Sequence, residues 1–355
     1  MNILTIIGAR PQFIKASVVS KAIALHGDLT EFILHTGQHF DSNMSDVFFN
    51  ELEIPRPDFN LDIHGGPHGE MTGRMLCEIE KIMLNMRPDR VLVYGDTNST
   101  LAGALAASKL HIPVSHIEAG LRSFNMRMPE EVNRIVTDQL SDVLYCPTQA
   151  AIDNLMKEGF GEKNVEVKNV GDVMQDSAVY FARRARRPKA NTPDRDFILA
   201  TLHRAENTDD HERLTEIITA LNALNKTIAP VVLPLHPRTR SILSKLGLKL
   251  EFTVIDPVGY LEMVWLLKHC AIVLTDSGGV QKEAFFFGKM CVTMRDETEW
   301  VELVDVGVNT LVGADQRKII SAVSDKIGLS VVDDAKMFGG GEASKRIAEH
   351  LASLT

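Results

Sequence analysis

The sequence has few cysteines and no long hydrophobic segment. Four cysteines occur among 355 residues, and no two of them form a Cys-x-x-Cys pair. This scarcity argues against a disulfide-rich secreted scaffold, and it predicts reduced cysteines in a cytoplasmic protein. No apolar run approaches the ~20 residues of a membrane-spanning helix, and the apolar stretch before Arg10 is too short for a signal peptide. We therefore expect no membrane partner.

Positive charge is also scarce. The chain has 38 Lys and Arg residues against 47 Asp and Glu residues, which gives a formal net charge of −9. Proteins that bind nucleic acids usually carry a basic surface, so we expect no nucleic-acid partner. An anionic ligand would need a local group of cations.

Two phosphate-binding signatures are missing. Neither Gly-x-Gly-x-x-Gly nor Gly-x-x-x-x-Gly-Lys-Ser/Thr occurs, which argues against a nicotinamide-dependent sugar epimerase and against a P-loop kinase. His64 and His68 lie in a Gly- and Pro-containing stretch that we interpret as a flexible loop. We expect neither a metal nor a cofactor.

Short apolar runs alternate with helix-like stretches, which is the pattern of parallel sheets with crossover helices. A chain of this length exceeds the size at which one core keeps growing, so we predict two domains, 1–172 and 173–340. The polar segment 181–195 between the two sets of strands is predicted to be a linker or a surface excursion. The predicted strands are 3–7, 31–35, 91–94, 113–117 and 143–146, then 197–201, 230–235, 252–255, 271–275 and 291–294. The fold class is therefore α/β, with two Rossmann-like domains facing across a cleft.

Charged residues follow the strands of the first half, where ligands of such folds bind. Arg10 and Lys15 lie on the loop and first turn after the first strand, which suits an anion site or simply a solvated basic helix start. Asp96 and Glu118 follow two later strands, and Glu130 begins a helix. Asp96 could instead cap the next helix, and Glu130 could only pair with a helix dipole. Together the three acids could supply proton transfer at one site.

The second half offers a histidine and a glycine turn. His203 directly follows a strand and is the best candidate for a general acid or base, although a structural role is also open. His236 follows the next strand. The run Ser277-Gly278-Gly279 joins a buried strand to a helix, so its bare N–H groups could hold a diphosphate while Glu283 accepts from ribose hydroxyls. A tight strand–helix turn is the alternative for this run.

These segments resemble the non-hydrolysing UDP-N-acetylglucosamine 2-epimerase family over essentially the whole chain. The motifs that carry the resemblance are Gly8–Lys15, Gly95–Thr100, His116–Arg122, Pro129–Arg134, His203–Glu206 and Thr275–Ala284. The likeness is greatest to the branch that acts on UDP-2,3-diacetamido-2,3-dideoxy-glucuronic acid in lipopolysaccharide O-antigen synthesis. Segments specific to that likeness include Ser123–Met128, Asp256–Leu261 and Arg295–Trp300.

The resemblance implies a glycosyltransferase-B-like architecture, a homodimer, and a C-terminal helix (341–355) that packs back on the first domain. It implies catalytic roles for Asp96, Glu118, Glu130 and His203. It implies contacts to the UDP-sugar substrate from Arg10, Lys15, His236, Ser277, Gly278, Gly279 and Glu283.

Some positions depart from the pattern of the enzymes that act on UDP-N-acetylglucosamine. Trp300 replaces an Arg, Val258 a Gln and Met263 a Phe, and Asp41 differs from the allosteric-site pattern. Changed contacts around an intact catalytic set fit a different sugar. We expect C2 epimerisation of the diacetamido-glucuronate, with epimerisation of UDP-N-acetylglucosamine or glycosyl transfer as alternatives.

Overall fold

The computed structural model describes residues 1–38, 53, 56–333 and 336–355. The chain divides into two compact units: unit 1 is Met1–Ser177 with Lys336–Thr355, and unit 2 is Ala178–Ala335. The sequence placed these divisions after residues 172 and 340. Asp41 lies outside the described residues.

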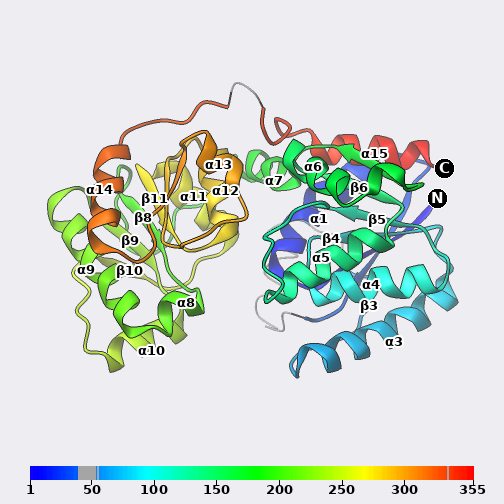
Figure 1. Ribbon diagram of the computed structural model, residues 1–355, viewed down its shortest axis with the longest axis horizontal. Helices are drawn as coiled ribbons and strands as arrows, with labels where there is room; N and C mark the ends of the chain where they lie inside the picture. Colours follow the sequence, from blue (N-terminus) through cyan, green and yellow to red (C-terminus); the bar gives the residue numbers. More distant parts are fainter. Residues whose placement is uncertain (39–52, 54–55, 334–335) are drawn as a thin grey trace. The chain divides into compact units, whose positions relative to one another are not determined.

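Unit 1 is built on a seven-stranded parallel sheet in the order β3-β2-β1-β4-β5-β6-β7. Figure 1 labels β3, β4, β5 and β6 of this sheet. Leu4 and Ile6 of β1 lie in a core with α3 and α4, and Ile3 and Ile7, which point to the opposite face, are also fully buried. Both faces are therefore covered. The strands are β1 (Asn2–Ile7), β2 (Thr30–His35), β3 (Phe59–Asn60), β4 (Arg90–Tyr94), β5 (Val114–Ile117), β6 (Val143–Cys146) and β7 (Glu166–Asn169). The helices are α1 (Arg10–Ile23), α3 (His68–Met86), α4 (Asn98–Lys109), α5 (Pro129–Leu140), α6 (Gln149–Lys157), α7 (Val173–Ala182), which runs into unit 2, and α15 (Ala343–Ser353), with a 3₁₀ turn at Phe160–Glu162.

Unit 2 has a six-stranded parallel sheet in the order β10-β9-β8-β11-β12-β13. Alternate residues from Phe197, just before β8, to Ala200 enter two separate cores, with Ile198 and Ala200 in one and Phe197 and Leu199 in the other. The strands are β8 (Ile198–Thr201), β9 (Val231–Pro234), β10 (Thr253–Ile255), β11 (Ile272–Thr275), β12 (Cys291–Thr293) and β13 (Asn309–Leu311). The helices are α8 (Ala205–Thr208), α9 (His211–Thr227), α10 (Pro237–Lys245), α11 (Tyr260–His269), α12 (Gly278–Phe286), α13 (Val301–Asp305) and α14 (Gln316–Lys326).

The predicted α/β class with two Rossmann-like sheets is confirmed. All ten predicted strands are present, and β3, β7 and β13 were missed. The segment 181–195 belongs to unit 2, where Arg187 donates to the carbonyl of Thr192 and pairs with Asp194, so it is a surface excursion. No helix in the described ranges is both long and apolar enough to cross a membrane.

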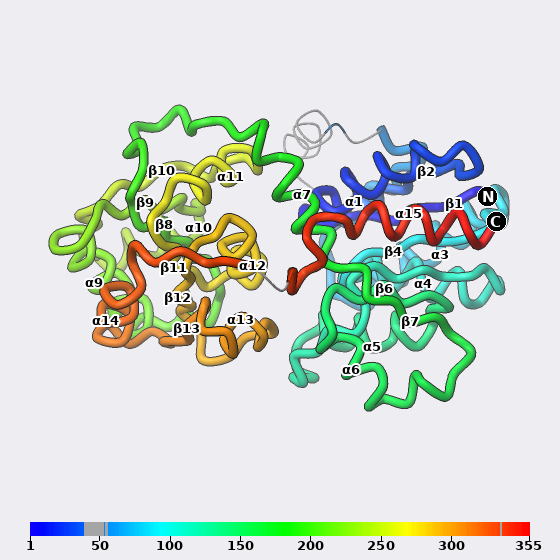
Figure 2. Tube along the Cα trace, turned by 90° about the horizontal axis from the view of Figure 1, so that it is seen from above, coloured from blue at the N-terminus to red at the C-terminus, as the bar shows by residue number. Residues whose placement is uncertain are grey.

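The C-terminal helix α15 belongs to unit 1, where it lies beside α1 (Figure 2). The carboxylate of Asp176 accepts from the backbone N–H groups of Ala343 (3.1 Å) and Ser344 (2.7 Å) at the start of this helix. Near its end, His350 lies 2.9 Å from the hydroxyl of Tyr145 on β6. The last residues of the chain thus complete the core that the first residues begin.

Candidate active site

The carboxyl ends of β1, β4 and β5 lie at one edge of the unit 1 sheet, because these neighbouring strands run parallel. The side chain of Gln12 connects the first two ends. Its oxygen accepts from the N–H groups of Gly8 (2.8 Å) and Ala9 (2.9 Å), and its nitrogen donates to the carbonyl of Tyr94 (2.8 Å). The loop that leads into Arg10 is therefore fixed against the end of β4.

Lys15 and Glu118 form an ion pair at this edge. Lys15 comes from α1 and Glu118 follows β5, and their side chains are only 8% and 11% exposed. Glu118 has a φ of +73°, a left-handed conformation that costs a non-glycine residue about 1–2 kcal/mol. Gly95, with φ of +62°, lies against the pair, and a Cβ there would be 3.1 Å from the Glu118 carboxylate. The structure thus brings together two of the predicted residues in a strained, nearly buried arrangement.

Asp96 accepts a hydrogen bond from the guanidinium of Arg134, which also donates to Glu131 at 2.7 Å. Burial alone would lower the pKa of Arg134, but the carboxylate of Asp96 and then that of Glu131 outweigh it and raise that pKa. The N-cap of α4 is Thr97, whose hydroxyl accepts from the N–H of Thr100. The interpretation of Asp96 as a helix cap is therefore wrong, and its side chain pairs with Arg134 instead.

Glu130 and Glu131 begin α5 but occupy different environments. Glu130 is exposed in the first turn. Glu131 is 1% exposed, and its carboxylate accepts from the backbone N–H groups of Ser123 and Phe124. Burial raises the pKa of Glu131, whereas the Ser123 N–H and the Arg134 guanidinium lower it more, so the net pKa is below its usual range. Glu131 orders the preceding loop and leaves Glu130 as the more accessible acid.

In unit 2, His203 follows β8 and lies next to Asp276, which follows the adjacent strand β11. The Nδ1 atom of His203 is 3.1 Å from the Asp276 carboxylate, which also accepts from the N–H groups of His203 (3.0 Å) and Arg204 (2.9 Å). Burial would raise the pKa of Asp276, but the hydrogen bond and charge of His203 and these N–H groups lower it overall. Because Asp276 faces Nδ1 and half of the His203 side chain is exposed, Nε2 is the nitrogen available for proton transfer.

The two glycines that open α12 differ in their surroundings. A Cβ on Gly278 would lie 2.0 Å from a carboxylate oxygen of Glu299, whereas a Cβ on Gly279 would have nothing within 4 Å. Packing alone therefore explains Gly278, as the tight-turn interpretation requires, but it does not explain Gly279. The N–H of Ser277 donates to the hydroxyl of Thr275 at 2.9 Å, and Glu283 is buried one turn into the helix. The geometry leaves open space at Gly279 where an anion could approach the helix N-terminus.

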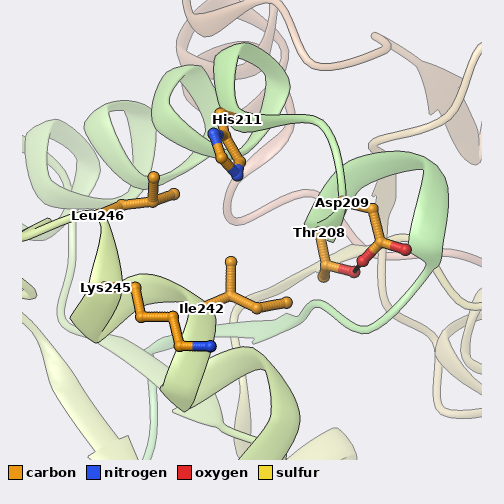
Figure 3. A pocket seen from close by; sticks show the side chains of 6 residues that line it. All are labelled: Thr208, Asp209, His211, Ile242, Lys245 and Leu246. Atoms are coloured by element: carbon orange, nitrogen blue, oxygen red, sulfur yellow. Dashed lines mark hydrogen bonds between the residues drawn. The ribbon is translucent and has the colours of Figure 1, made fainter.

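His236 is the N-cap of α10, and its Nδ1 accepts from the N–H of Arg238 at 3.3 Å. A pocket of about 450 Å³ lies nearby, between α8, the start of α9 and α10 (Figure 3). The pocket is lined by Thr208, Asp209, His211, Ile242, Lys245 and Leu246. None of these is a predicted site residue. Across the described part of the chain, no group of three or more His, Cys, Asp or Glu side chains could hold a metal ion.

Sequence reasoning missed several residues that hold the candidate groups in place. These residues all lie inside the motifs that the sequence analysis singled out: Gln12, Glu131, Arg134 and Asp276. Most of them contact residues that are distant in the chain, and Glu131 has the same side chain as its neighbour Glu130. The sequence cannot show that Glu131 is buried and Glu130 exposed, because that depends on which side of α5 faces the protein interior.

Comparison with known proteins decides the family. The model of the UDP-N-acetylglucosamine 2-epimerase family matches residues 21–352. The chain belongs to this family. As a UDP-N-acetylglucosamine 2-epimerase family member it is an isomerase, which confirms the resemblance of its motifs.

Relatives within the UDP-N-acetylglucosamine 2-epimerase family cover the full chain. The UDP-2,3-diacetamido-2,3-dideoxy-D-glucuronate 2-epimerase of Pseudomonas aeruginosa is 68% identical over 354 residues, all of both chains. The UDP-GlcNAc 2-epimerase of Methanocaldococcus jannaschii, solved with UDP-GlcNAc and UDP, is 41% identical with a TM-score of 0.88, over 99% of this chain and 100% of that one. The Neisseria meningitidis enzyme, solved with UDP-GlcNAc, is 31% identical with a TM-score of 0.89 over the same shares.

Proposed function

We propose that this chain interconverts UDP-2,3-diacetamido-2,3-dideoxy-D-glucuronate and its C2 epimer of manno configuration. The observation that carries the proposal is the 68% identity, end to end, to the Pseudomonas aeruginosa enzyme named for that substrate. Identity to the two structures of enzymes named for UDP-GlcNAc is 41% and 31%. Its place would be in lipopolysaccharide O-antigen or other surface-polysaccharide synthesis.

The chemistry explains why acids and a diphosphate site are both needed. The C2 proton of the pyranose is not acidic, because no carbonyl adjoins C2. We infer that the C1–O bond breaks first, with its electron pair leaving on UDP, and that a carboxylate then takes the C2 proton. The product is a bound 2-acetamidoglycal, which is protonated at C2 from the other face while the phosphate oxygen of UDP re-forms the bond to C1. Atoms and charge balance without an oxidant or reductant.

Two proton-transfer groups are required because the two faces of C2 are attacked in turn, and each well-placed group contributes roughly 10²–10⁴-fold in rate. Glu118 or Asp96 takes the proton on one face, and the exposed Glu130 serves the other. His203, oriented by Asp276, assists the leaving phosphate.

Binding of the nucleotide is assigned to the glycine turn of unit 2 and to a few cations. Positive charge near the diphosphate stabilises departing UDP. The residues proposed to contact the UDP-sugar are Arg10, Lys15, His236, Ser277, Gly278, Gly279 and Glu283. Lys15 also forms the ion pair with Glu118.

A substrate panel tests the proposal. Initial rates with UDP-2,3-diacetamido-2,3-dideoxy-glucuronate and with UDP-N-acetylglucosamine, followed by proton NMR, should give a kcat/KM at least about 10-fold higher for the diacetamido-glucuronate, since a site built for a charged group discriminates against its absence. A preference for UDP-N-acetylglucosamine would instead select the second candidate, epimerisation of the sugar for which the family is named. Turnover of neither sugar would point to glycosyl transfer to an acceptor.

We also propose that the chain acts as a homodimer in the cytoplasm. The resemblance of the motifs to a homodimeric family supports the first point, and the free thiols of the buried Cys146, Cys270 and Cys291 fit a reducing compartment. Sedimentation velocity should give twice the 39.3 kDa mass of the chain. A species of the single-chain mass at working concentration would contradict the dimer.

A further inference from the structure

The loop between Arg122 and α5 contains the segment Ser123–Met128, to which the mechanism above gives no task. It begins five residues after Glu118 and ends two residues before Glu130, so it joins the elements that carry two of the proposed proton-transfer groups. Any substrate engaged by those groups lies close to this loop.

Hydrogen bonds to α5 and within the loop fix its backbone. The buried carboxylate of Glu131 accepts the N–H groups of Ser123 and Phe124, at 3.0 and 2.9 Å, and the same carboxylate pairs with Arg134, which binds Asp96. Asn125 turns the chain by accepting the N–H of Arg127 at 3.1 Å. The loop is therefore connected by direct contacts to one of the proposed catalytic carboxylates.

The loop holds two apolar side chains and one arginine exposed on its surface. Phe124 has a φ of +57°, a strained conformation for an aromatic residue, and is 77% exposed. Met126 is 62% exposed, and Arg127 is exposed. Backbone strain that displays a side chain on a rigid loop is typical of a ligand contact.

A negatively charged sugar would need a further cation beside the candidate acids. Two cations beside the candidate acids have carboxylate partners, since Lys15 pairs with Glu118, and Arg134 pairs with Asp96 and Glu131. A third, Arg10, is assigned above to the UDP part of the substrate. Arg122, just before the loop, pairs with Asp138 and Glu158. A sugar that brings its own C6 carboxylate to this acidic edge would be repelled without another positive group.

We propose that Arg127 binds the C6 carboxylate of the sugar and so determines the preference for a uronate over a neutral hexose. Phe124 and Met126 provide apolar surface beside it for the acetamido methyl groups. This inference rests on the proposed function and deepens it by assigning a specificity residue. A planar guanidinium matches a carboxylate with two parallel hydrogen bonds, which Lys would reproduce only in part.

The test compares two substrates that differ only at C6: UDP-2,3-diacetamido-2,3-dideoxy-glucuronate and the corresponding UDP-2,3-diacetamido-2,3-dideoxy-glucose. In Arg127→Gln, kcat/KM for the uronate should fall roughly 10- to 100-fold, chiefly through KM, while that for the neutral sugar changes less than about twofold. Arg127→Lys should lie between. Arg87→Gln is the matched control, because Arg87 is exposed in unit 1 at the other end of the sheet, before β4, and it should change neither value.

The outcomes separate the two claims. If the wild-type enzyme turns over the uronate and Arg127→Gln lowers both substrates equally, or neither, the assignment of Arg127 is overturned and the proposed function stands. If the wild-type enzyme turns over the neutral sugars but not the uronate, the proposed function fails, and the inference fails with it.

Discussion

Gly95 shows how a single residue protects the ion pair of Lys15 and Glu118. Its φ of +62° is unfavourable for any side chain, and a Cβ would press on the Glu118 carboxylate. We expect Gly95→Ala to lose about 1–2 kcal/mol of stability from the backbone and about 100-fold in turnover from the displaced carboxylate. Gly159→Ala is the control, since Gly159 has φ of +83° with open space around it. Urea unfolding and C2 epimerisation rates measure the two effects; equal turnover in both variants would show that the pair tolerates displacement.

Asp276 makes a prediction about pH. Its pKa in the folded protein lies below the ordinary value of 3.8, because the hydrogen bonds from His203 and its neighbours outweigh burial. The stabilisation is therefore present above about pH 4 and is lost as pH falls through the lower pKa of the folded state. Asp276→Asn should lower the free energy of unfolding by about 1–3 kcal/mol near pH 7, and this difference from the wild type should become smaller toward pH 3.

The measurement is the free energy of unfolding between pH 3 and pH 7. Its control is Asp256→Asn, which changes a 93% exposed carboxylate. Its stability should follow the wild type across the whole range. A deficit of Asp276→Asn that is the same near pH 3 as near pH 7 would mean that the ionised form of Asp276 is not what stabilises the β8 loop.

At the scale of elements, burial decided which strands could be predicted. The central strands β4 and β8 are buried on both faces, and each contains a continuous apolar run, Val-Leu-Val-Tyr in β4 and Ile-Leu-Ala in β8. The missed strands β3, β7 and β13 all lie at sheet edges, and β7 (Glu-Val-Lys-Asn) is half exposed. An edge strand needs only one partner and little apolar surface, so its sequence resembles a loop.

The same limit applies to the site. The ends of strands can be recognised in the sequence, so Asp96, Glu118 and His203 could be placed at the carboxyl ends of strands. Their partners could not: Asp276 is 73 residues from His203 and Arg134 is 38 residues from Asp96. Asp96 and Thr97 are adjacent and both suit an N-cap, and only the backbone geometry shows that Thr97 takes that position.

At the scale of the whole molecule, unit 1 is assembled from both ends of the chain. Its last helix, α15, buries Ile347, Ala348 and Leu351 completely. Ile347→Ala should cost about 2–5 kcal/mol, and because unit 2 has its own cores, the loss should be local. Hydrogen exchange should accelerate in the strands of unit 1 and stay unchanged in those of unit 2. Lys345→Ala, on the exposed face of the same helix, is the control. Faster exchange in both units would contradict independent cores.

In the proposed reaction, C2 is inverted by elimination and re-addition of UDP with two proton-transfer groups. The direct measurement is proton NMR of UDP-2,3-diacetamido-2,3-dideoxy-glucuronate with the enzyme in D₂O. We predict that the manno epimer appears with deuterium at C2, and that Glu118→Gln still binds UDP but turns over roughly 10²–10⁴-fold more slowly. An epimer that keeps its original hydrogen at C2 would contradict elimination and re-addition of UDP. Full activity in Glu118→Gln would remove Glu118 from the mechanism and leave Asp96 as the base.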